Sequence, residues 1–211
     1  MDTTLKNIVS FTITADQDVD QDFIAITFAA SESGTNANDL QALLAAKLKD
    51  ALEVARKKEV PGKVDVRSGI FQINPTYDKK GVVIGYRGTV TMIVSGTDSE
   101  TILKLTGVIT TMTVNDVQQS ISQARRKEVE QILALKAIKL WRERSKTYSD
   151  AFGSTAFTLV NADISYNNRY PTYARSMSLS LESEGGSGQI DAEPGKETLT
   201  ITVTGSIHLH S

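Results

Sequence analysis

Apolar residues recur at every second position in several short segments of the chain and at every third or fourth position in two longer ones. Alternation is typical of a strand with one buried face, whereas spacing by three and four is typical of an amphipathic helix. The helical spacing predicts long helices over 37–59 and 126–152, and Asp98 or Ser99 is expected to cap a shorter one ending near 111. The alternating segments predict strands at 7–14, 23–30, 64–74, 82–95, 113–123, 156–167, 176–181 and 198–210.

The pattern also predicts which side chains are buried. In the last strand, apolar residues such as Leu199, Ile201 and Val203 alternate with threonines, so one face is expected to lie against the core. In the strand over 82–95, Val82, Ile84, Tyr86, Val90, Met92 and Val94 are expected to face one way. The buried side of the second long helix is expected to consist of Val129, Ile132, Leu133, Ile138, Trp141, Tyr148 and Phe152.

The order of these elements predicts the fold class. A strand, a helix and two strands follow one another over about 20–95, and the same order returns over about 113–210. Helices that pack on one face of antiparallel sheets bury the apolar faces of both. The sequence therefore predicts an α+β fold of two βαββ-like units, with antiparallel sheets packed against long helices. Unit one is expected at about 7–96 and unit two at about 97–211.

Composition excludes several classes of protein. The chain has 211 residues, a net charge of −2 and no cysteine, so disulfides, thiolate nucleophiles and cysteine-bound zinc are absent. Without a basic excess, nucleic acid is not an expected partner. Apolar runs fall far short of the about 20 residues of a transmembrane helix. The first four residues lead almost directly into a strand, so we expect no signal peptide within them.

Two groups of polar residues are candidate metal sites. Asp16, Asp18 and Asp20 resemble the start of a calcium loop, but such a loop needs Gly at its sixth position and Glu at its twelfth, and the chain has other residues at both. We therefore expect a solvated acidic turn there. His208 and His210 project from one face of a strand, and whether they bind metal stays open because two ligands are fewer than a zinc site normally has.

The sequence contains no Gly-x-Ser-x-Gly elbow, no phosphate-binding Walker loop and no dinucleotide fingerprint. We therefore expect no catalytic residue, no cofactor and no enzymatic activity, with an unrecognised hydrolase as one alternative. A polar loop at 166–175 combines tyrosines with arginines, which are enriched at interfaces. We expect this loop to contact a partner or a ligand through Tyr166, Arg169, Tyr170, Tyr173 and Arg175. A second alternative function is therefore a binding module for a small molecule or a cell-envelope component.

Several segments together resemble the SIMPL-domain family, also called YggE-like. The most specific is the stretch from Phe71 to Tyr77, with its Pro-x-Tyr, followed by Gly85–Tyr86. The others are the acidic turn and strand from Asp22 to Phe28, the long helix from Ala137 to Gly153, and the closing stretch with Glu193–Lys196 and Thr202–Ile207. The chain departs from the family pattern at Gln21, where a proline is usual, and at Trp141.

The resemblance implies an α+β fold, export to the periplasm or secretion, and self-assembly into a homo-oligomer, ring-like in some members. It also implies a structural role or a role in oxidative-stress tolerance. It carries no catalytic residue over to this chain. The missing signal peptide is then expected because the sequence is that of a mature form.

Overall fold

The structure is a computed structural model that describes residues 7–166 and 195–210. These residues form two compact units, and the chain passes from one to the other more than once. Unit 1 contains residues 7–20, 123–166 and 196–210, and unit 2 contains 21–122 together with residue 195. Antiparallel sheets and helices make up both units, so the expected α+β class is confirmed.

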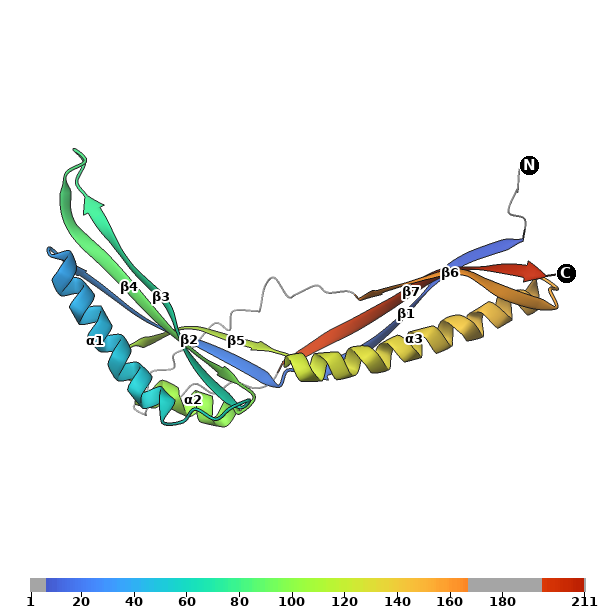
Figure 1. The fold of residues 1–211 in the computed structure, drawn as a ribbon, viewed down its shortest axis with the longest axis horizontal. Helices are drawn as coiled ribbons and strands as arrows, with labels where there is room; N and C mark the ends of the chain where they lie inside the picture. Colours follow the sequence, from blue (N-terminus) through green and yellow to red (C-terminus); the bar gives the residue numbers. More distant parts are fainter. Residues whose placement is uncertain (1–6, 167–194, 211) are drawn as a thin grey trace, which may run out of the picture. The chain divides into compact units, whose positions relative to one another are not determined.

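Unit 2 is a four-stranded antiparallel sheet with two helices (Figure 1). The strands lie side by side in the order β3-β4-β2-β5, and β3 and β4 form the hairpin that the alternating pattern predicted. In chain order the elements are β2 (Phe23–Gly34), α1 (Ala37–Arg56), β3 (Val64–Tyr77), β4 (Val83–Gly96), α2 (Ser99–Val108) and β5 (Thr113–Ser120).

The core of unit 2 lies between the sheet and α1. Alternate residues of β2 and β4, among them Phe28 and Met92, are fully buried against Leu44 of α1. A Cβ atom at Gly88 on β4 would come within 2.4 Å of the side chain of Leu44, so that fully buried side chain would have to shift. The absence of a side chain thus lets the helix approach the sheet closely.

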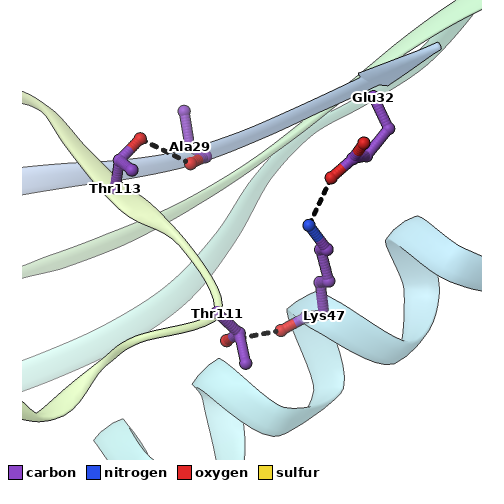
Figure 2. Close-up of polar contacts among 5 residues, drawn as sticks. All are labelled: Ala29, Glu32, Lys47, Thr111 and Thr113. Atoms are coloured by element: carbon purple, nitrogen blue, oxygen red, sulfur yellow. Dashed lines mark hydrogen bonds and ion pairs between the residues drawn. The ribbon is translucent and has the colours of Figure 1, made fainter.

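Polar contacts also attach α1 to the sheet, as Figure 2 shows. The ammonium group of Lys47 on α1 pairs with the carboxylate of Glu32 on β2, and both side chains are about one-third exposed. The hydroxyl of Thr111 donates to the backbone carbonyl of Lys47 at 3.3 Å, and that of Thr113 donates to the carbonyl of Ala29 at 3.2 Å. The segment entering β5 is therefore bonded to both the helix and the sheet.

Asp98 caps the N-terminus of α2, as the sequence predicted. Hydrogen bonds from the backbone N–H and the hydroxyl of Thr101 hold the pKa of Asp98 below its ordinary 3.8. Because the pKa is lowered in the folded state, this contribution to stability is present above pH 3.8 and is lost as the pH falls through the folded pKa.

We expect Asp98→Asn to weaken that acid dependence. The asparagine oxygen can still accept from Thr101, but it does not titrate. Urea unfolding followed by far-UV circular dichroism gives the unfolding midpoint at each pH. As the pH is lowered from neutral to below 3.8, this midpoint should fall less steeply for the variant than for the unaltered chain. Identical slopes for the two proteins would show that Asp98 does not contribute to the acid sensitivity.

Unit 1 is a three-stranded antiparallel sheet with one long helix along one face (Figure 1). Its strands are β1 (Ile8–Asp20), β6 (Ala156–Tyr166) and β7 (Lys196–His210), in the order β1-β7-β6. The helix is α3 (Gln123–Ala151). Alternate residues of β7 from Leu199 to Leu209 are buried, as their pattern predicted.

An aromatic cluster holds α3 on this sheet. Trp141 of α3 is 4% exposed and stacks on Phe11 of β1, with ring centroids 5.0 Å apart, while Tyr148 meets the same Phe11 ring edge-on. Trp141 lies over Gly205 of β7, where a Cβ atom would come within 2.8 Å of the indole ring. This glycine therefore provides the space that the indole occupies.

Some sequence expectations were wrong. Ile132 of α3 is 55% exposed, because Val129, Leu133 and Trp141 face the narrow sheet, and Phe152, which follows the end of α3, is 67% exposed. Val82, which precedes β4, and Ile84 on β4 are exposed as well, at 59% and 62%.

The acidic series is not a turn. Asp16, Asp18 and Asp20 lie inside β1, because β7 is long enough to pair with the whole of that strand.

The two sheets also divide the strands differently from the two sequential units expected. The strand β5, expected to open the second unit, pairs with β2 in the sheet of unit 2. The first strand, β1, pairs instead with the last one, β7. The order of helices and strands along the chain does not reveal which distant strands pair. The order therefore suggested two βαββ units, and the strand pairing of the two sheets does not follow that repeat.

Candidate functional site

The predicted contact loop at 166–175 lies almost entirely outside the described residues. Its first residue, Tyr166, is the last residue of β6, pairs with Ile201 and is 47% exposed. Arg169, Tyr170, Tyr173 and Arg175 lie outside the described part of the chain. The role predicted for the loop therefore stays a prediction.

The two histidines lie together on β7. The rings of His208 and His210 meet edge-on with centroids 4.8 Å apart, and Nε2 of His210 lies 3.0 Å from the hydroxyl of Thr158. Among residues 7–166 and 195–210, no group of three or more His, Cys, Asp or Glu side chains gathers as a metal site would require. His210 thus has a hydrogen-bonding partner on the neighbouring strand, and whether the pair binds metal stays an open question.

A row of hydroxyl pairs follows β1 and β7 on one face of the unit 1 sheet. Ser10 and Ser206 are 2.7 Å apart, and Thr12 and Thr204 are 3.0 Å apart. Further along the row, the hydroxyl of Thr198 donates to the carboxylate of Asp18 at 2.7 Å. These cross-strand pairs stabilise the sheet, and the acidic series is part of the regular pairing of β1 with β7.

The outer strands of the two sheets differ in how they are protected against pairing with another chain. Edge strands in natural proteins are protected by charges, proline, bulges or short length. The edge strand β1 ends in a row of carboxylates, and β5 has only 8 residues. On the edge strand β3, Arg67 and Pro75 accompany two shifts of register.

Among the strands that the structure describes, the remaining edge is β6, and it has almost none of this protection. Over its 11 residues it contains no lysine, arginine or proline and one charge, Asp163. It has one shift of register, between Leu159 and Asn161. All its side chains except that of Phe157 are exposed, including Leu159 at 60% and Val160 at 49%.

The apolar exposure of β6 arises from the packing of α3. The helix contacts β1 and β7 more extensively than β6, so apolar side chains of β6 remain uncovered beside it. Sequence reasoning predicted this strand but missed its importance. The signal was present as an 11-residue stretch of high β propensity with a single charge.

A second group of exposed apolar residues lies at the tip of the β3–β4 hairpin. Tyr77, Val82, Val83 and Ile84 are between 44% and 62% exposed around a turn in which Asp78 accepts from the backbone N–H groups of Lys80 and Val82. Figure 1 shows this hairpin reaching past α1, so the helix does not cover it. The alternating pattern over 82–95 placed Val82 and Ile84 on the apolar face of a strand. It does not show how much of the hairpin α1 covers.

No helix within the described residues has the length and apolar character needed to span a membrane.

Comparison with known proteins places the chain in a family. No curated protein matches the chain. The family model SIMPL, whose description is "Protein of unknown function (DUF541)", matches residues 9–207, from the start of β1 to near the end of β7. The match covers nearly all of the 211 residues, so the chain belongs to the SIMPL family.

Proposed function

We propose that this SIMPL protein is a non-enzymatic structural protein that self-assembles through β6. The observation that supports the proposal is the unprotected edge of that strand. Within the described residues this edge pairs with no further strand, and with a single charge, Asp163, it is suited to antiparallel pairing with the same strand of a second copy. Leu159 and Val160, which lie at the register shift of β6 and are 60% and 49% exposed, would lose exposure on pairing.

Pairing of β6 with β6 relates two copies by a two-fold axis and by itself ends at a dimer. Growth into a larger, ring-like assembly requires a second contact surface. The apolar tip of the β3–β4 hairpin, with Tyr77 and Val83 opposite each other, offers one. Exposed apolar groups of this kind are typical of surfaces that another molecule covers.

The periplasmic or secreted location and the structural or stress-protective role rest on the family resemblance. They belong to the proposal for that reason alone. The absence of catalytic motifs from the sequence supports the non-enzymatic part. A binding module acting through the loop at 166–175 is the alternative function, and among its residues the structure describes Tyr166.

The test is to place positive charge on the β6 edge. We expect Leu159→Lys/Val160→Lys to convert the assembly to a species of 22.9 kDa in multi-angle light scattering, because two added lysines on each edge strand repel those of a second copy. Both side chains are about half exposed, so the fold should tolerate the change, and thermal unfolding of the variant checks this.

The matched control is Asn115→Lys/Gln118→Lys, which adds the same charge to exposed residues of the β5 edge. This control should keep the mass of the unaltered chain. The proposal fails if the unaltered chain is a monomer at micromolar concentration, or if the β6 variant keeps its full assembled mass.

A further inference from the structure

Unit 2 contains a cavity between the end of α1 and α2 that no part of the proposed assembly uses. Its volume is about 390 Å³, within the range of about 300–1,000 Å³ that small-molecule sites occupy. The side chains that line it are Val54, Lys57, Lys58, Thr101, Lys104, Leu105 and Val108.

The lining divides into an apolar part and a cationic part. Leu105 is 3% exposed and belongs to the core, whereas Val108 is 59% exposed and faces the opening. The hydroxyl of Thr101 is already donated to Asp98 at 2.8 Å, so it contributes little polarity to the cavity. An entering molecule would therefore meet aliphatic side chains and ammonium groups.

Three lysines at one cavity are unexpected in a chain with a net charge of −2. Lys57 and Lys58 follow the last turn of α1, where positive charge stabilises the helix dipole, and this accounts for their presence in part. It does not account for Lys104, which lies in the middle of α2.

Lys104 stays cationic at neutral pH. Its Nζ lies 2.5 Å from the carboxylate of Glu100, and that hydrogen bond raises the pKa of Lys104 above its ordinary 10.5. The salt bridge is exposed and therefore easily exchanged for another anion. Within the described part of the chain, no ion pair joins Lys57 or Lys58 to a carboxylate.

We propose that this cavity binds a single-chain anionic amphiphile, with its head group at Lys58 and Lys104 and its alkyl chain against Val54, Leu105 and Val108. The lining favours this class over a nucleotide, because it offers no aromatic ring for a base to stack on and no arginine to bind phosphate in a bidentate way. An inorganic anion would leave the aliphatic part of the cavity unused.

The test uses the full chain and three probes that separate charge from chain length. Dodecanoate carries both the anion and the chain, dodecyltrimethylammonium carries the same chain with the opposite charge, and inorganic phosphate carries the anion alone. Calorimetric titration below the micellar concentration should show one dodecanoate bound per protein chain. The cationic probe should bind at least about tenfold more weakly, because the lysines repel its head group, whereas they form charge-assisted hydrogen bonds with the carboxylate of dodecanoate.

The variant Lys58→Gln/Lys104→Gln should weaken dodecanoate binding by about tenfold or more. The matched control is Lys136→Gln/Lys139→Gln on α3, which also removes two charges and one ion pair four residues apart, Lys139–Glu143. This control should leave binding unchanged. Val108→Ser, at a half-exposed position, should weaken binding without changing thermal unfolding.

Several outcomes would overturn the proposal. Equal binding of the two dodecyl probes, or equal losses in the lysine variant and its control, would mean adsorption to exposed apolar surface. Binding of phosphate as tightly as dodecanoate would mean that the aliphatic lining has no role. The residues of this cavity belong to unit 2 and include none from β6, so the site and the assembly can fail or succeed separately.

Discussion

Replacing Trp141 by alanine should lower the unfolding free energy of unit 1 by about 3–5 kcal/mol, the range for removing a large buried aromatic side chain. The indole is 4% exposed and fills the space between Phe11 and the bare backbone at Gly205. A sheet of three strands under one helix has few neighbouring side chains that could move into the cavity left behind. Urea unfolding followed by far-UV circular dichroism measures the loss.

The conservative variant Trp141→Phe keeps an aromatic ring against Phe11 and should cost clearly less than the alanine variant, about 1–2 kcal/mol. Hydrogen exchange measured by mass spectrometry should show faster exchange in β1 and β7 of the alanine variant, with unit 2 unchanged. A loss below that of the phenylalanine variant would contradict the packing described for the indole.

Replacing Gly96 by alanine should lower the unfolding free energy of unit 2 by about 3 kcal/mol or more, since backbone strain and overpacking act together. Gly96 ends β4 with φ near 157°, and a Cβ atom there would overlap the carbonyl of Lys63. That carbonyl accepts hydrogen bonds from the backbone N–H groups of Thr97 and Asp98 at 3.0 and 3.2 Å, so it cannot move away freely.

Gly107→Ala is the matched control for this substitution. Gly107 lies in α2, and nothing stands within 4 Å of the place its Cβ would occupy. Alanine there should be neutral or stabilising by up to about 1 kcal/mol because it favours the helix. The only tryptophan, Trp141, belongs to unit 1, so circular dichroism rather than fluorescence must follow both variants. Equal stability of the two variants would contradict the strain assigned to Gly96.

Local signals in the sequence were sufficient to predict most elements. Asn36 caps α1, and its side chain accepts from the N–H of Asn38 as an N-cap should. The alternation from Leu199 to Leu209 correctly identified the buried face of β7. Both depend on neighbouring residues only, which is why one sequence can reveal them.

Features that depend on distant partners could not be predicted in this way. Ile132 has a helical spacing that suits burial, yet the sheet beneath α3 is too narrow to cover it. The acidic series read as a turn because carboxylates are rare in strands, and its pairing with β7 depends on residues about 180 positions away.

The candidate surfaces illustrate the same limit. The sequence drew attention to Tyr166 and the arginines and tyrosines after it because such residues are conspicuous at interfaces. The sequence of β6 shows only that it contains few charges and no proline. The order β1-β7-β6 of the described strands is what places β6 at an edge. The cavity at Lys58 and Lys104 likewise exists because α1 and α2 converge, which their separate patterns do not indicate.

The place of β7 has a consequence for biosynthesis. It is the middle strand of its sheet, yet the ribosome makes it after both of its neighbours. While translation continues, β1 and β6 have no strand between them, and Phe11 and Ile164 lack the backbone against which they later align. By contrast, all four strands of the β3-β4-β2-β5 sheet are synthesised before α3. The nascent chain therefore exposes the apolar side chains of β6 until β7 has been made, and during that interval it is most prone to aggregation and most in need of a chaperone.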